Sequence, residues 1–337
     1  MTEPLLSVRN LTVEFPTRRG ILTAVQDISF DIMPGEVLGV VGESGAGKSM
    51  TGSAIMRLIE RPGRIAQGEV ILQGRRIDNL PDAEMRKIRG RKIGMIFQDP
   101  LTSLNPLYRI SEQLIETIRT HLPLSETEAR KKAVGLLDDV GIPDASRRID
   151  DYPHQFSGGM RQRVVIALAL CAGPDLVIAD EPTTALDVSV QAQIIDVMKR
   201  LCAENGAAIM LITHDMGVIA ETADRVAVMY AGRIAEIGPV RDVIKDAKHP
   251  YSAGLMGAIP RLGANLERLT QIPGSMPRLS AIPRGCAFNP RCEHVMDKCR
   301  LDQPQPVQIA PGRQVSCWLY PPQGDTVNSI DERRLAE

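Results

Sequence analysis

Gly42-Glu43-Ser44-Gly45-Ala46-Gly47-Lys48-Ser49 is the stretch that decides the fold of this 337-residue chain. It matches G-x-x-x-x-G-K-[ST], the pattern of a phosphate-binding loop. The apolar run Val37–Val41 before it is rich in Val and predicts a buried strand. The residues after it, from Met50 to residue 59, predict a helix that ends before Pro62. Strand, glycine loop and helix therefore follow one another in the order that phosphate binding requires.

The chemistry of this loop predicts a nucleotide site. Its glycines let backbone N–H groups curl round phosphates, and the helix N-terminus adds the positive end of its dipole. We expect Lys48 to reach the β- and γ-phosphates and the Ser49 hydroxyl to coordinate Mg²⁺. Met50 completes the predicted nucleotide-binding set that starts at Gly42. A chance glycine turn is the alternative, but it would not explain the flanking strand and helix, so we predict an ATP or GTP site.

The composition is that of an ordinary globular protein. Hydrophobic residues make up 43% and charged residues 24% of the chain, which allows a sizeable core. The length suggests two domains, or one large domain with an appendage. A net charge of −1 gives no electrostatic footprint for nucleic acid or for an anionic membrane, so no nucleic-acid partner is expected.

The sequence also predicts a cytoplasmic location. The residues from Met1 to Pro4 lack the basic and apolar regions of a signal peptide. The longest apolar run, near residues 164–172, is too short to span a membrane. In a reducing compartment the six cysteines are not expected to form disulfides, so a group of them suggests a metal site.

Two kinds of apolar pattern predict two sheets. Period-two alternation predicts the strands of a small antiparallel sheet, at residues 6–8, 11–15, 24–32 and 70–72. Continuous apolar runs predict the buried strands of a mostly parallel α/β sheet, at residues 93–97, 176–180, 208–213 and 226–229. A helix is predicted at residues 188–201, between two of these buried strands.

A helical insertion is predicted between the strands near residues 97 and 176. From residue 102 to residue 153 apolar residues recur at helical spacing, and Ser125 and Glu128 are spaced as a capping box. A further helix is predicted to run from the glycine stretch near residue 158 to Ala172. We therefore predict a helical subdomain of about residues 102–172 inside the nucleotide-binding core.

The composition changes at Pro239. The last 99 residues hold twelve of the 24 prolines and four of the six cysteines. Because proline removes backbone donors and interrupts helices and sheets, this region is predicted to be mostly loops. The predicted division is an ATP-binding domain at 1–238, a small second domain at 239–322 and a tail at 323–337.

The predicted strand at residues 176–180 ends in two acids, Asp180 and Glu181. An acid at a strand end can hold Mg²⁺, usually through water, and a second carboxylate beside it can polarise the attacking water. Solvated acids at the tip of an ordinary strand are the alternative. The phosphate-binding loop earlier in the chain favours the catalytic interpretation.

A second glycine stretch leads to a family resemblance. Ser157-Gly158-Gly159 places a hydroxyl and bare backbone donors before a predicted helix, although such a tripeptide is also common in linkers. Residues 156–163, F-S-G-G-M-R-Q-R, resemble the signature sequence of ATP-binding cassette (ABC) proteins. Residues 180–187, D-E-P-T-T-A-L-D, resemble the Walker B motif and D-loop of that family. The resemblance covers about residues 5–240 and implies an α/β P-loop NTPase core with an antiparallel β subdomain and a helical subdomain.

The resemblance implies that each ATP lies between two subunits. In this family two ATP-binding domains close head to tail, so Ser157, Gly158 and Gly159 are expected to bind the γ-phosphate that a partner subunit holds. Glu181 matches the general base, and His214 matches the switch histidine that contacts the γ-phosphate. A lone histidine at a strand end would otherwise suggest a structural role.

Three further residues match family motifs outside the loop. Gln98 matches the Q-loop residue that contacts Mg²⁺ and water, and the segment after it is expected to face the membrane partner. Asp187 matches the D-loop aspartate that crosses the dimer interface. Phe15 lies where an aromatic ring stacks on adenine, but a strand phenylalanine is as often a core residue, so both alternatives stay open.

The variants Phe156 and Met160 in the signature are those expected in the branch that imports oligopeptides and dipeptides. Lys248-His249-Pro250-Tyr251 resembles the His-Pro-Tyr motif that opens the C-terminal region of that branch. The resemblance implies an ATPase whose hydrolysis is coupled to peptide uptake. Importers of nickel, glutathione or oligosaccharides are the alternative within the branch, and a non-transport ABC ATPase is a more distant one.

An importer ATPase needs partners. The resemblance implies two membrane permease subunits, an extracytoplasmic peptide-binding protein and a second ATPase subunit, which is expected to be a paralogue rather than a copy of this chain. The predicted location is accordingly the cytoplasmic face of the cell (inner) membrane, where the permease subunits hold the ATPase.

Four cysteines predict a metal site in the C-terminal region. Cys286, Cys292, Cys299 and Cys317 are separated by five, six and 17 residues, and four thiolates can bind Zn²⁺ or an iron–sulfur cluster. Structural zinc sites favour pairs of ligands with two to four residues between them, and this spacing is missing, which favours a cluster. Members of the peptide branch with a similar end carry a [4Fe-4S] cluster. Zinc and free thiols remain the alternatives, and Cys171 and Cys202 are expected to be packing residues.

Overall fold

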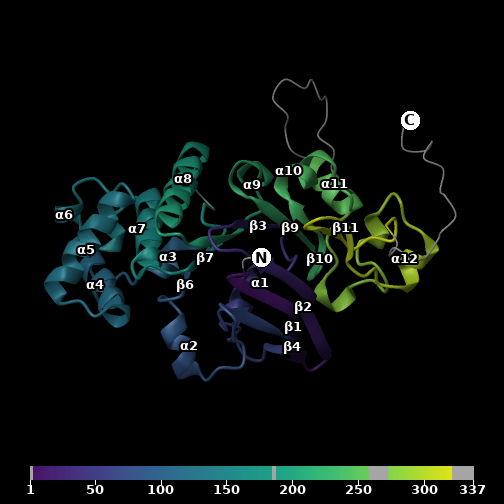
Figure 1. Cartoon of the computed structure of the whole chain (residues 1–337), viewed down its shortest axis with the longest axis horizontal. Helices are drawn as coiled ribbons and strands as arrows, with labels where there is room; N and C mark the ends of the chain where they lie inside the picture. Colours follow the sequence, from purple (N-terminus) through teal and green to yellow (C-terminus); the bar gives the residue numbers. More distant parts are fainter. Residues whose placement is uncertain (1–2, 184–186, 258–271, 321–337) are drawn as a thin grey trace.

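The computed structural model describes residues 3–183, 187–257 and 272–320 (Figure 1). The predicted tail at 323–337 and part of the second predicted domain lie outside the described residues. So do Thr184, Ala185 and Leu186 of the D-loop resemblance.

Two sheets form the frame of the molecule. In spatial order, the larger sheet contains β11 (Val307–Ala310), β12 (Arg313–Val315), β10 (Arg233–Pro239), β9 (Arg225–Tyr230), β3 (Val37–Val41), β8 (Ala208–Ile212), β7 (Leu176–Asp180) and β6 (Ile93–Ile96). The smaller sheet contains β2 (Gly20–Ile32), β1 (Leu6–Thr17), β4 (Arg64–Leu72) and β5 (Arg75–Arg76). All pairings of the smaller sheet are antiparallel, as predicted.

The centre of the larger sheet is parallel, which confirms the predicted α/β core. Strands β6, β7, β8, β3 and β9 pair in parallel with one another. All residues of β3, β7 and β8 are buried, which explains why these strands are continuous apolar runs. Strand β6 ends at Ile96, one residue before the predicted end, and Phe97 after it is exposed.

Along the chain, each of the named helices lies between two of these strands. They are α1 (Lys48–Ile55), α2 (Asp82–Ile88), α3 (Pro100–Ser103), α4 (Ile110–His121), α5 (Glu126–Asp139), α6 (Ala145–Arg148), α7 (Gly158–Leu170), α8 (Val188–Glu204), α9 (Met216–Thr222), α10 (Val240–Lys245), α11 (Pro250–Gly257) and α12 (Asp297–Leu301). Short 3₁₀ turns are η1 (Pro153–Gln155), η2 (Leu279–Ala281) and η3 (Asn289–Arg291). No helix of the described ranges is both long enough and apolar enough to cross a membrane.

The helical insertion forms a lobe at one end of the molecule, as predicted. Figure 1 shows α4–α7 in this lobe, with the C-terminal region at the opposite end of the long axis. The Ser125 hydroxyl accepts from the Glu128 N–H, and the Glu128 carboxylate accepts from the Ser125 N–H, so the capping box is confirmed. Helix α7 ends at Leu170, two residues before the predicted end.

Helix α1 differs from its prediction at both ends. It begins at Lys48 rather than Met50, so the last two residues of the phosphate-binding pattern are already helical. It ends at Ile55, not at residue 59, because Arg57 adopts a left-handed backbone conformation with φ +51°. The Leu58 N–H then bonds back to the Ser53 carbonyl at 2.8 Å, which closes the helix end.

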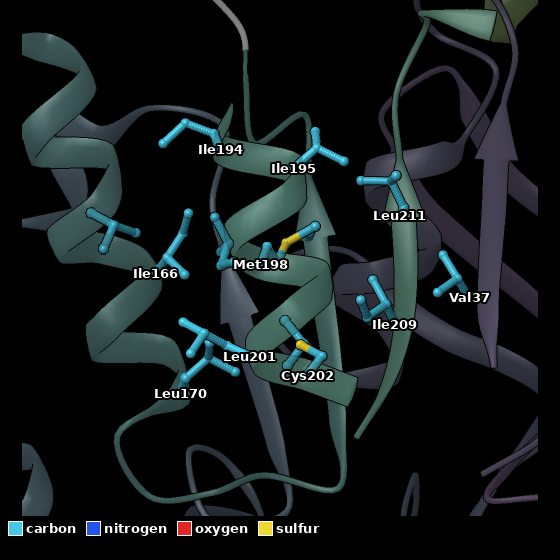
Figure 2. Packing of buried hydrophobic residues seen from close by; sticks show 14 of the residues in the cluster. Val37, Ile166, Leu170, Ile194, Ile195, Met198, Leu201, Cys202, Ile209 and Leu211 are labelled. Carbon is cyan, nitrogen blue, oxygen red and sulfur yellow. The ribbon is translucent and has the colours of Figure 1, made fainter. Parts of the chain in front are cut away.

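Side chains on the two faces of the parallel sheet belong to two separate cores. Ile209 and Leu211 of β8 belong to the core that includes residues of α7 and α8. The alternate residues Met210 and Ile212 belong to the core that includes α1 and the antiparallel sheet. Figure 2 shows the helical side, where α8 lies between α7 and β8. Cys202 of α8 is fully buried in this core, and burial raises the pKa of its thiol to about 12, which confirms its role in packing.

The C-terminal region is joined to the larger sheet by strand pairing. Strand β12 pairs antiparallel with β10, with Val315 opposite Glu236. The fully buried Glu236 accepts from the Arg313 guanidinium at 2.7 Å, so the two strands also share a buried ion pair. The sheet therefore continues across the predicted boundary between residues 238 and 239.

Candidate nucleotide-binding site

The phosphate-binding loop connects β3 to α1 and depends on glycine at two tight points. Gly42 has φ +152°, and a Cβ placed there would lie 2.2 Å from the Met229 carbonyl oxygen. Gly47 has φ +100°, and a Cβ there would lie 2.9 Å from the Ala24 carbonyl oxygen. Neighbouring backbone therefore excludes any side chain at these positions, and the loop keeps a surface of bare backbone.

The Lys48 ammonium lies in the curve of the loop. Its Nζ donates to the carbonyl oxygens of Gly42 at 2.9 Å and Glu43 at 3.1 Å. Burial lowers the pKa of Lys48, and the nearby carboxylates of Glu181 and Asp180 oppose that shift. A buried ammonium that donates to two backbone carbonyls is suited to bind phosphate oxygens as a point charge.

Ser49 and Asp180 meet at the edge of the loop. The Ser49 hydroxyl donates to Asp180 Oδ1 at 2.9 Å. Burial raises the pKa of Asp180, and Glu181 adds to the shift, while Ser49 and Lys48 oppose it. A hydroxyl and one carboxylate are the donor set that Mg²⁺ uses when nucleotide phosphates and water supply the remaining ligands.

Three strand ends bring together the predicted catalytic residues. Glu181 follows β7, Gln98 follows β6 and His214 follows β8, so the parallel order of the strands places all three at one edge of the sheet. Gln98 Nε2 donates to Glu181 Oε2 at 3.0 Å, and His214 Nδ1 lies 3.4 Å from Glu181 Oε1.

The backbone of Glu181 is held in an unusual conformation. Its φ of +46° lies in the left-handed region, and its N–H donates to the Ile212 carbonyl at 2.8 Å. For a residue other than glycine this conformation costs about 1–3 kcal/mol. That cost indicates that the position of the Glu181 side chain is important for function.

The signature residues lie apart from this cluster. Ser157 caps α7, because its hydroxyl accepts from the Met160 N–H at 3.3 Å, and both Ser157 and Gly158 are exposed. Among the hydrogen bonds of the described ranges, none joins residues 157–159 to the phosphate-binding loop. In Figure 1, α7 belongs to the helical lobe, whereas α1 lies at the centre of the molecule.

Two further predicted residues also lie apart from it. Asp187 is exposed directly before α8. Phe15 of β1 is half-buried opposite Leu22 and packs against the core beneath the antiparallel sheet. Adenine stacking by Phe15 stays a prediction.

The four predicted cysteine ligands gather in one place. Cys286, Cys292, Cys299 and Cys317 line a single small cavity, together with His249 and Phe288. Burial raises the pKa of Cys286 to about 11 and that of Cys317 to about 12, with neighbouring thiols adding to both shifts. These four thiols are the donor set of a four-thiolate metal site. Within residues 3–183, 187–257 and 272–320, however, no three His, Cys, Asp or Glu side chains form a group that could hold a metal ion.

Sequence patterns did not predict two residues at the loop. Tyr251 and Arg291, both from the C-terminal region, contact Glu43 through its N–H and its carboxylate. The His-Pro-Tyr motif marks Tyr251, but no local signal relates it or Arg291 to the loop.

Comparison with known proteins places these features in a family. The ABC transporter family matches residues 25–184, and the oligopeptide/dipeptide transporter C-terminal region matches residues 235–299. The chain is 50% identical over 316 residues to the oligopeptide transport ATP-binding protein OppD of Escherichia coli, covering 94% of this chain and 93% of that protein. The chain belongs to the ABC transporter family. Within it, the chain is an ATP-binding subunit of the oligopeptide/dipeptide branch.

Other relatives of this ABC ATPase agree. OppD of Haemophilus influenzae is 49% identical over 94% of this chain and 97% of its own length. The dipeptide transport ATP-binding protein DppD of Bacillus subtilis is 48% identical over 94% and 95%. The dimeric post-hydrolysis structure of the ATP-binding cassette MJ0796, bound to ADP and Pi, superposes with a TM-score of 0.64 and 30% identity over 70% of this chain and 99% of that one.

The family confirms the main expectations from the sequence. This protein is the ATPase subunit of an oligopeptide/dipeptide ABC importer, with a P-loop NTPase core and an added C-terminal region. The roles of individual site residues, the pairing of subunits and the contents of the cysteine cavity go further than this and are proposed below.

Proposed function

We propose that the ATPase site of this importer subunit is half of a composite site. The loop at residues 42–49 binds ATP, and Ser157, Gly158 and Gly159 of a partner subunit close over the γ-phosphate. The observation that carries the proposal is the separation within one chain: Lys48, Ser49 and Glu181 converge, while the signature lies exposed at the start of α7.

The converging side chains support a division of labour in hydrolysis. Lys48 and the loop backbone hold the phosphates, and Glu181 takes a proton from the water that attacks the γ-phosphorus as the bond to ADP breaks. Gln98 and His214 orient the Glu181 carboxylate through their contacts at 3.0 and 3.4 Å. Ser49, with Asp180 and Gln98, would hold Mg²⁺, which supplies neutralisation of the phosphate charge.

The family and an exposed apolar segment support a set of partners. Phe97, Leu107 and Tyr108 are 45%, 81% and 53% exposed, and they flank the segment that was expected to face the membrane partner. Such a group of exposed apolar side chains supports docking to permease subunits. We propose two permease subunits, an extracytoplasmic peptide-binding protein and a paralogous ATPase partner. The complex would hold this chain at the cytoplasmic face of the inner membrane. Relatives named for oligopeptide or dipeptide transport favour peptide cargo over nickel, glutathione or oligosaccharides.

Ser157→Arg tests the composite site. ATP binding to the isolated chain should stay within about twofold of wild type, because the signature does not contact its own loop. ATP hydrolysis by the assembled transporter should fall about a hundredfold, because the partner's γ-phosphate loses its donors. Ser125→Arg is the matched control, since Ser125 is likewise an exposed residue that caps a helix of the same lobe. Loss of ATP binding by isolated Ser157→Arg would show that the signature closes its own site.

We further propose that the cysteine cavity belongs to a functional unit of residues 239–322 and binds a [4Fe-4S] cluster. Cys286, Cys292, Cys299 and Cys317 would be the ligands, because they line one cavity, although binding would have to bring the thiols closer together than they lie among the described residues. The cluster would supply a rigid cross-link to a loop-rich region. Zn²⁺ at the same thiols is the alternative.

The metal content of the protein decides between these alternatives. Anaerobically purified protein should be brown and contain about four iron and four sulfide ions per chain. Cys292→Ser should lose the colour, whereas Cys171→Ala, which changes a buried cysteine of the helical core, should keep it. A colourless protein with one zinc per chain would support the alternative, and a metal-free protein would contradict both.

A further inference from the structure

The C-terminal region contacts the phosphate-binding loop directly. The Glu43 N–H donates to the Tyr251 hydroxyl at 2.9 Å. The Glu43 carboxylate accepts two hydrogen bonds from the Arg291 guanidinium, Nη1 to Oε2 at 3.0 Å and Nη2 to Oε1 at 2.9 Å. We call Glu43, Tyr251 and Arg291 the loop clamp. It joins the second residue of the loop to two residues more than 200 positions further along the chain.

The Arg291 side chain is held in place by contacts other than its ion pair with Glu43. Its side chain is only 7% exposed, and its Nε donates to the Pro273 carbonyl at 2.8 Å. Its guanidinium carbon lies 5.8 Å from the ring centres of both Tyr230 and Phe288. Parallel hydrogen bonds from a preorganised guanidinium give a pair that is stronger and more directional than an exposed ion pair.

Tyr251 is fixed equally well. It is fully buried, and its ring packs edge-on against Tyr230 with centroids 4.6 Å apart. Its N–H donates to His249 Nδ1 at 3.0 Å. Burial lowers the pKa of His249 to about 4, so the imidazole is neutral near pH 7 and can accept this bond. The hydroxyl of Tyr251 therefore has a defined position under the loop.

The residue that the clamp holds also contacts Lys48. The Glu43 carbonyl accepts from Lys48 Nζ at 3.1 Å, while the Glu43 N–H donates to the Tyr251 hydroxyl. The clamp therefore fixes the peptide group before Glu43 through Tyr251 and the Glu43 side chain through Arg291, next to the carbonyl that binds Lys48. In addition, Arg291 neutralises a carboxylate that would otherwise repel the phosphates bound by the same loop.

We propose that Tyr251 and Arg291 are positioning residues of the nucleotide site, which makes the C-terminal region a part of that site. The proposal deepens the proposed ATP-binding role of the loop at residues 42–49. The clamp contacts themselves involve no thiol, but Arg291 directly precedes Cys292, and His249 and Phe288 line both the clamp and the cysteine cavity.

The test uses three clamp variants of the full chain, Tyr251→Phe, Arg291→Met and Arg291→Lys. Equilibrium binding of ATP to Arg291→Met should weaken at least about fivefold, and Tyr251→Phe should show a smaller loss. In the assembled transporter the KM for ATP should rise with kcat nearly unchanged, because the clamp acts on ground-state binding. Arg291→Lys should recover part of the loss, since it restores the charge without the paired geometry.

Arg130→Met is the matched control for these variants. Arg130 makes a bidentate ion pair with Asp150 in the helical lobe, far from the loop in sequence, and its loss should leave ATP binding unchanged. A double variant gives the sharpest comparison. In a Glu43→Gln background, Arg291→Met should weaken ATP binding much less than it does alone, because the carboxylate that it balances is gone.

Two outcomes would overturn the clamp. In the first, the Tyr251 and Arg291 variants keep wild-type ATP affinity and KM while their unfolding midpoints fall, which would show a purely structural contact. In the second, the Glu43→Gln and Arg291→Met losses add fully. Lys48→Ala separates the clamp from the site itself. If Lys48→Ala still binds ATP, the loop assignment fails; if it does not bind ATP and the clamp variants bind normally, only the clamp fails.

Discussion

Lys48→Ala is expected to abolish ATP binding, raising the dissociation constant at least about a hundredfold. The Lys48 ammonium is buried in the curve of the loop, where its present acceptors are two backbone carbonyls. Two charge-assisted hydrogen bonds to phosphate, at about 1.5–3 kcal/mol each, correspond to a loss of that size. Equilibrium titration of the full chain with ATP measures it.

Lys92→Ala is the control for this result. Lys92 is paired with the carboxylate of Asp175 at 2.9 Å, but it is 41% exposed and lies directly before β6, away from the loop. Its removal should leave ATP affinity unchanged. Unchanged affinity in Lys48→Ala itself would contradict the assignment of the loop. Circular dichroism of both variants separates loss of binding from loss of fold.

Glu181→Gln should stop hydrolysis and trap ATP. A glutamine keeps the size of the side chain and can still bond to Gln98, but it cannot take a proton from the attacking water. General-base catalysis contributes about 10²- to 10⁴-fold, so turnover in the assembled transporter should fall by that factor. ATP should still bind, because Lys48 and Ser49 are intact, and the two ATPase subunits should remain closed around it.

Turnover and light scattering in the presence of ATP and the ATPase partner measure both effects. Glu204→Gln is the control, since Glu204 is an exposed acid at the end of α8 that pairs with Arg200 on the same helix. It should retain normal turnover. Wild-type turnover in Glu181→Gln would remove Glu181 from the role of base, and inactive protein that stays monomeric with ATP would argue against closure.

Much of the site follows from chain order alone. A phosphate-binding loop after one parallel strand, and acids after another, must come together at the carboxyl edge of the sheet. The structure confirms this in the Ser49–Asp180 and Gln98–Glu181 contacts. The ends of α1 were predicted less well, because the left-handed backbone of Arg57 is a local choice that apolar periodicity does not encode.

Phe15 shows a different limit of sequence patterns. Its alternation with neighbouring residues predicts that one face of β1 is buried, and the half-buried ring agrees. The same alternation is compatible with a core position and with a stacking surface for adenine. A period-two pattern shows which face of a strand is buried. Whether a residue on that face packs in the core or stacks on a ligand depends on what lies against it.

By itself, the sequence determined the nucleotide site, the α/β core and the family, because these depend on local patterns: glycines at turn positions, apolar periodicity and acids at strand ends. Only the tertiary structure decided that the C-terminal region reaches back to the loop. Tyr251 and Arg291 contact Glu43 across 208 and 248 residues of chain, beside a sheet that β12 extends. Contacts of that range depend on the path of the whole chain and on the pairing of buried polar groups, and no single stretch of sequence carries that information.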